Sequence, residues 1–387
     1  MRINRIAAFV LFVISLIVIS FKGGPAAYGF FFFTLMVPFV SLVYTLIVFI
    51  RFKIYQEIDT KVIVAGNSTP FYFTLQNEDL FTHSGVKIGY FSDFSSISGL
   101  ELDAEYELSP HTGIRKETLL VCRYRGEYEV GIKSVTVTDY LRLFSIKFKN
   151  RETLKVTVMP RLEILKGSVS PDMIIKPSGN PPLQKKIPDI PVRDYTAGDD
   201  IRMINWKSTA RFGKPLVRTM TGEETPSVKI VMDSCRYDED AGGHLPLENK
   251  ILETVLAVSY LLSGEGISVS VIGYNDRIVR FDLADQDGFE EFYRAISAFS
   301  FRKDNTVKKL LAACGTDNGF LAQGGVIYVF HEWDESMSVF ADEMNGVQDS
   351  QTLMLISDEP GGSLSVLPGY MNCSVIGYED RLTEVLG

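Results

Sequence analysis

The stretch Ile6–Phe21 reads IAAFVLFVISLIVISF, and the stretch Tyr28–Ile50 reads YGFFFFTLMVPFVSLVYTLIVFI. Neither run contains a charged residue. An α-helix needs about 20 apolar residues to cross the hydrocarbon core of a bilayer. The second run is long enough, and the first is short by a few residues, which Lys22 can offset by reaching the interface. The turn-like link Lys22–Ala27 therefore predicts a transmembrane helical hairpin over residues 1–52.

Basic residues flank this hairpin at its two ends: Arg2, Arg5, Arg51 and Lys53. Only Lys22 lies in the link between the runs. Because positive charge stays on the cytoplasmic side of a membrane, the pattern predicts that the body of the protein lies in the cytoplasm at the inner membrane. The alternative is a cleaved signal peptide over residues 6–27, which would leave one span and could place the body outside.

Residues 53–160 carry alternating apolar and polar side chains. Phe71, Phe73 and Leu75 occupy every second position of one run, and turn signals such as Gly66-Asn67 separate the runs. Short alternating strands with regular turns are typical of an antiparallel β-sandwich. We therefore predict a β-sandwich domain over residues 53–160.

A proline-rich stretch and then a different pattern follow. The prolines of residues 161–192 exclude a regular helix or central strand, so residues 161–227 are predicted to hold a linker and a charged segment. From Val228 onward, strand-like and helix-like runs alternate, which predicts a doubly wound α/β domain over residues 228–387 with a parallel sheet covered on both faces. Ligands bind such sheets beyond the carboxyl ends of the strands, where we expect Asp233.

The charged segment, residues 193–214, reads RDYTAGDDIRMINWKSTARFGK. Asp199 or Asp200 can cap a helix that Gly213 ends. Lys207 and Arg211 are four residues apart on that helix and repel each other, so an acidic group should compensate them. Two interpretations stay open: an internal ion-pair network, or a docking surface for an acidic partner or a phosphate.

On the second interpretation, eight residues are candidates for binding a partner or an anion: Arg193, Asp199, Asp200, Arg202, Trp206, Lys207, Arg211 and Lys214. The formal net charge of the chain is -9. An acidic chain repels nucleic acid unless it carries a concentrated basic patch, so we expect a protein partner and no nucleic acid.

The charged segment resembles the signature of the family catalogued as domain of unknown function 58. The resemblance extends to Tyr124–Tyr128, Thr138–Phe144 and Val158–Pro160, and the two N-terminal runs fit it too. It implies a C-terminal domain similar to von Willebrand factor type A domains. It also implies genetic association with MoxR-type AAA+ ATPases and transglutaminase-like membrane proteins. Family members often carry His or Asp where this chain has Asn205, so no acid–base role is carried over to that position.

Type A domains often bind a divalent cation through Asp-x-Ser-x-Ser and a later Thr and Asp. In the matching stretch, Asp233–Tyr237, Cys and Tyr replace the two serines. Thr306 can stand in for the later Thr, but His331 follows the strand after which the Asp is expected. Soft Cys does not suit magnesium. The sequence therefore favours no cofactor, with Asp233 capping its own turn, and a Mg²⁺ site at Asp233 and Thr306 is the alternative.

The common enzyme motifs are absent from the sequence. Gly264–Gly266 follows a predicted helix, which is the wrong context for dinucleotide binding, and His331-Glu332 lacks the second His of a zinc protease. The sequence therefore predicts a membrane-anchored, non-enzymatic adaptor whose cytoplasmic body binds a protein, with a MoxR-type ATPase as the partner that the resemblance implies. The alternative is a divalent-metal-dependent enzyme or adhesion-type binder with a degenerate site at Asp233.

Overall fold

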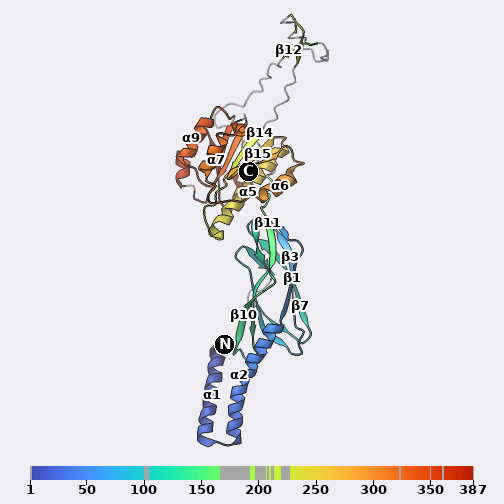
Figure 1. Cartoon of the computed structure of the whole chain (residues 1–387), viewed down its shortest axis with the longest axis vertical. Coiled ribbons are helices and arrows are strands. Elements are labelled where there is room, and N and C mark those ends of the chain that lie inside the picture. The colour runs from blue at the N-terminus through green and yellow to red at the C-terminus, as the bar shows by residue number, and fades with distance from the viewer. Residues whose placement is uncertain are drawn as a thin grey trace. The chain divides into compact units, whose positions relative to one another are not determined.

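The computed structural model describes residues 2–99, 104–165, 192–196, 206, 209–210, 213–218, 227–321, 324–348, 350–359 and 361–386. The chain divides into two compact units, Met1–Arg161 and Leu162–Gly387. Figure 1 labels the elements of both units.

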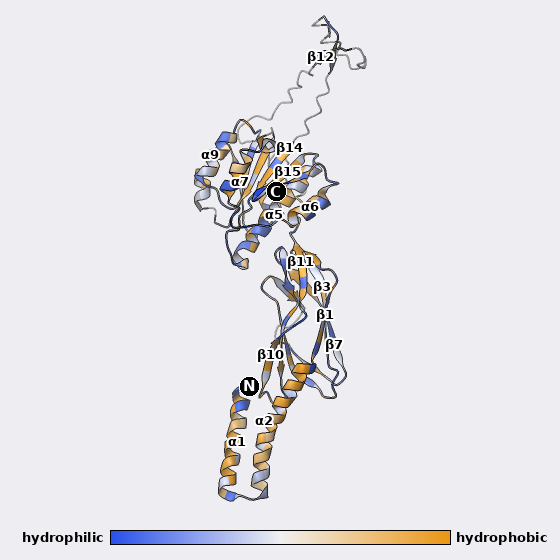
Figure 2. Cartoon of the chain, in the orientation of Figure 1, coloured by the Kyte–Doolittle hydropathy of each residue, from blue (hydrophilic) through white to orange (hydrophobic). Residues whose placement is uncertain are grey.

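Two apolar helices begin the first unit: α1 (Arg2–Lys22) and α2 (Pro25–Arg51). Both are long and apolar enough to cross a membrane, and they are predominantly orange in the hydropathy colouring of Figure 2. Gly23 and Gly24 adopt positive φ in the link, a conformation that costs glycine little. The Thr34 hydroxyl donates to the Ser15 hydroxyl oxygen across the pair at 3.0 Å. The two predicted apolar helices and the turn between them are confirmed, and their insertion into a membrane stays a prediction.

Short strands follow and form three sheets in the described part of this unit. Two sheets are antiparallel, with the orders β1-β3-β7-β5 and β10-β9-β4-β6, and in the third sheet β11 pairs parallel with β2 and antiparallel with β8. The strands are β1 (Lys53–Ile58), β2 (Val62–Val64), β3 (Ser68–Gln76), β4 (His83–Tyr90), β5 (Ser95–Ser98), β6 (Glu105–Leu108), β7 (Gly113–Cys122), β8 (Gly126–Val130), β9 (Ile132–Thr138), β10 (Ser145–Lys149) and β11 (Leu154–Met159).

One hydrophobic cluster joins these sheets. In β3 the alternate residues Phe71, Phe73 and Leu75 are buried, whereas their neighbours are partly exposed. A slip of one residue would turn this apolar row toward solvent, so burial specifies the register of the strand. Val48 of α2 belongs to the same cluster and is fully buried. The predicted alternating strands are therefore confirmed, and the last turns of α2 share their core.

The second unit contains a six-stranded sheet with the order β16-β15-β14-β17-β18-β19. Its strands are β14 (Ser227–Met232), β15 (Ser268–Asn275), β16 (Arg277–Leu283), β17 (Gly325–Phe330), β18 (Ser350–Ile356) and β19 (Asn372–Ile376). One hydrophobic cluster contains residues of α5 (Ala241–Gly264), α6 (Phe289–Ser297) and α10 (Leu382–Val385). A second cluster contains residues of α7 (Val307–Cys314), α8 (Asn318–Leu321), α9 (Glu335–Met344) and the 3₁₀ helix η2 (Gly361–Val366). The sheet is covered on both faces, as predicted.

The sheet is mixed rather than wholly parallel. β16 pairs antiparallel with β15, and the two strands are joined by a tight turn at Asp276, whose φ is +60°. The prediction of a parallel sheet is wrong at this edge. A strand reached through a tight turn must run antiparallel, because a parallel neighbour needs a long crossover.

Residues at the beginning of the predicted linker pack in the second unit. Leu165 is buried in the cluster that holds α5, and a carboxylate oxygen of Glu163 accepts a hydrogen bond from the Leu382 N–H at 2.8 Å. The core of this unit therefore includes residues that lie well before the first strand of its sheet. Residues 166–191 of the proline-rich stretch lie outside the described residues.

Candidate functional site

The charged segment between the sandwich and the sheet is described in part. β12 (Val192–Asp194) pairs antiparallel with β13 (Leu216–Arg218), and Trp206, Thr209 and Ala210 are helical. Gly213 has a φ of +69°, and its N–H donates to the Thr209 carbonyl at 2.9 Å. This is the left-handed glycine that commonly ends a helix, so the prediction for Gly213 is confirmed.

The eight candidate binding residues divide by what the structure describes. Trp206 is 67% exposed and Lys214 is also exposed, whereas for Arg193 only the backbone on β12 is described. The other five lie outside the described residues: Asp199, Asp200, Arg202, Lys207 and Arg211. The docking surface and the internal ion-pair network both stay predictions.

A second candidate site lies where the parallel strands of the six-stranded sheet end. The strand order reverses between β14 and β17, which are neighbours in the sheet but are separated in the chain by two other strands. In doubly wound sheets, ligands bind at such a reversal, outside the carboxyl ends of the strands. Asp233 follows β14 and His331 follows β17, so the sheet brings together two residues that are 98 positions apart.

The Asp233 carboxylate is fully buried and accepts three hydrogen bonds. The Cys235 N–H donates to Oδ1 at 2.9 Å, and the Tyr237 hydroxyl (2.8 Å) and the His331 N–H (3.3 Å) donate to Oδ2. Burial raises the pKa of the Asp233 carboxyl above its usual range, and these three hydrogen bonds oppose the rise. The predicted capping of the following turn is confirmed for the Cys235 amide.

Aromatic rings adjoin this carboxylate. The rings of Tyr237 and His331 meet edge to face with centroids 4.7 Å apart, and the Tyr378 ring lies 6.3 Å from that of His331. His331 Nδ1 lies 2.8 Å from the Ile356 carbonyl oxygen. A carbonyl oxygen can only accept, so Nδ1 carries the proton, and in the neutral ring Nε2 is left as the acceptor. A ligand at the strand ends would therefore meet aromatic faces and one imidazole nitrogen.

The two residues predicted for a divalent cation, Asp233 and Thr306, have different surroundings. Thr306 is exposed, and its carbonyl begins α7 by accepting from the N–H groups of Lys309 and Leu310. Burial raises the pKa of Cys235 to about 11, which keeps it a thiol rather than a metal-binding thiolate. Within the described ranges, no group of three or more His, Cys, Asp or Glu side chains could hold a metal. Mg²⁺ needs several convergent oxygen ligands, and Asp233 is the only carboxylate in this predicted set, so these residues do not fit Mg²⁺.

Sequence reasoning missed a buried amide in the loop before α7. This loop is tied to the end of β14, because the Arg302 N–H donates to the Ser234 carbonyl at 3.2 Å. Asn305 is 1% exposed, and among the residues that the structure describes neither of its side-chain polar atoms has a hydrogen-bond partner. Buried amides normally bond to protein or water, so Asn305 is a polar position that a small ligand or water could satisfy. Nothing in its sequence context indicates burial.

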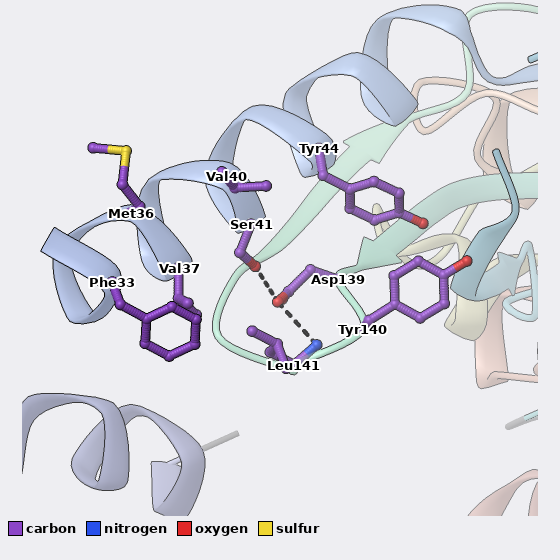
Figure 3. Close-up of a pocket in the computed structure, with 9 residues that line it drawn as sticks. All are labelled: Phe33, Met36, Val37, Val40, Ser41, Tyr44, Asp139, Tyr140 and Leu141. Atoms are coloured by element: carbon purple, nitrogen blue, oxygen red, sulfur yellow. Dashed lines mark hydrogen bonds between the residues drawn. The ribbon is translucent and has the colours of Figure 1, made fainter. Parts of the chain in front are cut away.

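A third site lies where α2 meets the sandwich (Figure 3). It is an open, almost wholly apolar groove of about 430 Å³, lined by Phe33, Met36, Val37, Val40, Ser41, Tyr44, Asp139, Tyr140 and Leu141. The Ser41 hydroxyl donates to the buried carboxylate of Asp139, which also accepts from the N–H groups of Leu141 (3.2 Å) and Phe144 (2.7 Å). Neither Ser41, inside an apolar run, nor Asp139 signals its partner in the sequence.

Residues 191–318 match the family model described as "Protein of unknown function DUF58". The match supports the DUF58 family. It covers the charged segment and continues through Asp233 and the loop before α7, but His331 and Tyr378 of the second site lie beyond its end. The search of curated proteins found no match to the chain.

Solved structures that are similar to parts of the chain share little sequence with it. Salmonella alpha-2-macroglobulin reacted with methylamine is 12% identical over 27% of this chain and 7% of its own, with a TM-score of 0.21. The FixG-related protein from Vibrio parahaemolyticus is 8% identical over 28% of this chain and 96% of its own, with a TM-score of 0.19. This chain thus spans about 7% of the length of the first of them. Similarities at these TM-scores carry no conclusion about fold or function.

Proposed function

We propose that this chain is a membrane-anchored adaptor without a catalytic role. Its two N-terminal helices cross the inner membrane, and its body docks a protein partner in the cytoplasm. The observation that carries the proposal is that one helix is both a candidate membrane span and part of a folded core. α2 is apolar over a length that can span a bilayer, and its last turns place Val48 in the core of the sandwich. The basic residues at the ends of the hairpin support the cytoplasmic side.

Several contacts join this anchor to the sandwich. The Tyr44 hydroxyl donates to the Thr82 carbonyl at 2.8 Å, and Arg51 pairs with the buried Asp79 at 2.5 Å. From α1, Asn4 Nδ2 donates to the Leu141 carbonyl at 2.8 Å. A flexible linker would only keep a domain near the membrane, whereas these contacts also hold its orientation. A fixed orientation relative to the membrane would present the same surface of the domain to a partner that is itself bound or recruited to the membrane.

The docking surface that we propose is the charged segment of residues 193–214. Its Trp206 is largely exposed, and Trp and Arg are the residue types that most often dominate binding at protein interfaces. The basic side chains of the segment would meet an acidic or phosphate-bearing surface. The family resemblance makes a MoxR-type AAA+ ATPase our first candidate, with a transglutaminase-like membrane protein as a further member of the assembly. The strand order of the second unit supports a von Willebrand factor type A-like domain as the rest of the platform.

A pull-down from native membranes tests the partner. The full chain, extracted in mild detergent, is expected to recover the MoxR-type ATPase in at least one nucleotide state (ATP, ADP or none). The variant Trp206→Ala should lose most of it. Leu80→Ala removes another exposed apolar side chain, from the first unit, and should retain the partner. Recovery of the ATPase in no nucleotide state, or equal recovery with Trp206→Ala, contradicts the proposed partner or surface.

Protease accessibility tests the side of the membrane. Trypsin added to intact spheroplasts is expected to leave the body whole and to digest it after lysis. Digestion before lysis would place the body outside, as the signal-peptide alternative requires. The chain should also remain in the membrane pellet after alkaline carbonate washing, and its release would contradict insertion of the two helices.

A further inference from the structure

We propose that the groove between α2 and the loop 139–144 binds one anionic phospholipid of the surrounding bilayer. One acyl chain lies along α2, and the phosphate lies at the N-terminal end of α1. This inference rests on the proposed membrane insertion of α1 and α2. It adds a specific lipid-binding site to the proposed membrane anchor.

The first wall of the groove is a stripe of α2. Phe33, Val37 and Ser41 are four residues apart and share one face of the helix, with Met36 and Val40 beside them. Phe33, Met36 and Val40 are exposed large apolar side chains. Phe33, Met36 and Val37 lie in the part of the candidate span that precedes the contacts with the β-strand domain, so the medium around them in an inserted chain is hydrocarbon. An apolar groove at this depth is filled by an acyl chain rather than by water.

The second wall is a loop held in one conformation. The Asp139 carboxylate accepts from the N–H groups of Leu141 and Phe144, and Arg142 adopts a φ of +54° within the turn. Tyr140 donates through its hydroxyl to the Thr82 carbonyl at 2.9 Å, and Leu141 points toward the stripe of α2 in Figure 3. A wall whose conformation is already held loses little entropy when a chain binds against it.

Basic side chains lie at the polar end of the groove, and they favour a lipid with an anionic headgroup. Arg5 Nε donates to the Leu143 carbonyl at 2.6 Å, and Asn4 donates to the carbonyl of Leu141, which lines the groove. These two bonds place the first turn of α1, with Arg2 and Arg5, beside the groove at the end of the span. Guanidinium groups bind phosphate through paired hydrogen bonds, and basic side chains near the bilayer surface attract anionic lipid. Charge complementarity therefore favours an anionic phospholipid over a zwitterionic one.

Native mass spectrometry of the full chain tests this site. The chain is reconstituted in nanodiscs of equal parts phosphatidylglycerol and phosphatidylcholine and released into mild detergent, and the retained lipid is counted and identified. One phosphatidylglycerol per chain is expected to remain. Met36→Trp fills the groove and should lose it. Leu35→Trp is the matched control, because Leu35 is the neighbouring residue, is equally exposed (42% against 45%) and does not line the groove.

The variant Arg5→Gln tests the headgroup. The preference for phosphatidylglycerol should fall about fivefold, the factor that corresponds to about 1 kcal/mol for one basic side chain at an anionic surface. The lipid itself should still be retained, because the apolar walls are unchanged. An unaltered preference would contradict the placement of the phosphate beside α1.

Other outcomes overturn the proposal in distinguishable ways. No retained lipid in a chain that enters nanodiscs, or equal retention by the two Trp variants, refutes the lipid site and leaves the anchor intact. A dimeric mass that Met36→Trp alone dissociates would assign the groove to a second copy of the chain instead. A chain that does not enter nanodiscs refutes the membrane anchor and the lipid site together.

Discussion

Two buried aspartates, one in each unit of the molecule, make a close comparison. Asp139 of the first unit and Asp233 of the second are 3% and 0% exposed, and each carboxylate accepts three hydrogen bonds. In both, one donor is the backbone N–H two residues further along, in Leu141 and Cys235 respectively. That local bond is the Asx turn that Asp commonly makes.

The two aspartates differ in the donor that comes from far along the chain. For Asp139 it is the hydroxyl of Ser41 on a candidate membrane span, and for Asp233 it is the backbone N–H of His331 at the end of a neighbouring strand. Both donors are 98 residues away. An aspartate therefore ties a candidate membrane span to the β-strand domain in one unit and lies at the carboxyl ends of parallel strands in the other. The two carboxylates thus share a local hydrogen bond and differ in the distant element that they hold.

The largest effect is expected for Asp233→Ala. This change leaves the buried Cys235 N–H and the partly buried Tyr237 hydroxyl and His331 N–H without their acceptor. An unsatisfied buried donor costs about 1–3 kcal/mol, so the free energy of unfolding of the second unit should fall by about 3 kcal/mol. Urea unfolding of the full chain in detergent, followed by fluorescence of the buried Trp333, measures it. The control Asp287→Ala removes an exposed aspartate of the same unit and should change the free energy by less than about 0.5 kcal/mol. A similar loss in both variants would contradict the role of the carboxylate.

A smaller effect, confined to the first unit, is expected for Asp139→Ala. One of its three donors is a side chain that can turn to another acceptor, so we expect a loss of about 2 kcal/mol. Hydrogen exchange should accelerate at the amides of Leu141 and Phe144, and the Trp333 signal should not change. Asp59→Ala, at an exposed position of the same unit, is the control. Unchanged exchange at both amides would show that the carboxylate does not hold the loop.

Tyr237→Phe is expected to cost about 1.5 kcal/mol at neutral pH, since it removes one hydrogen bond to a buried carboxyl group. It also removes a donor that lowers the pKa of Asp233, so the folded-state pKa, already raised by burial, rises further. A raised carboxyl pKa contributes stability below the unfolded-state value of about 3.9, and this stability is lost as the pH rises through the folded-state pKa. The cost of Tyr237→Phe should therefore shrink as the pH falls through the folded-state pKa of Asp233. A loss of unfolding free energy that does not change with pH would contradict the inference that the Tyr237 hydroxyl affects the pKa of Asp233.

The smallest effect is expected for Ser41→Ala, which removes only the distant donor of Asp139. A single hydrogen bond contributes about 1 kcal/mol, and the two backbone donors keep the carboxylate satisfied. Amide exchange at Leu141 should rise by less than in Asp139→Ala. Thr45→Ala is the comparison, because the Thr45 hydroxyl bonds only within α2, to the Ser41 carbonyl, and should leave the loop unchanged. An effect of Ser41→Ala as large as that of Asp139→Ala would mean that the tie to α2, and not the Asx turn, holds the loop.

Regular periodicity explains which elements could be predicted from the sequence. The uncharged runs before Lys53 predicted two helices, and the alternation at Phe71, Phe73 and Leu75 predicted a half-buried strand. Period and burial follow directly from such patterns. The residue pattern of β16 does not show whether the strand runs parallel or antiparallel to its neighbour. Its antiparallel direction is set by the tight turn at Asp276 that precedes it.

Only those features of the sites that depend on neighbouring residues in the chain could be predicted. Asp233 could be placed at the end of a strand and its bond to the Cys235 amide expected, because both depend on neighbours in the chain. Strand order and packing decide three other features of the sites. These are the hydrogen bond from the Tyr237 hydroxyl to the same carboxylate, the hydrogen bond from the His331 N–H, and the burial of Asn305. Cys and Tyr at the two serine positions weakened the expectation of a metal, but the sequence did not show that the tyrosine bonds to the carboxylate.

Spacing along the chain encodes the apolar helices, the alternating strands, the αβ pattern and the charged segment, so a reading of the residues finds each of them. Which distant groups meet depends instead on how the chain folds. The tertiary structure brought Ser41 to Asp139, so that a candidate membrane helix forms one wall of a groove and part of a domain core. It also brought His331 to Asp233, because a reversal of strand order makes neighbours of strands that the chain keeps apart. Contacts of this kind depend on burial and topology, which no local pattern of residues contains.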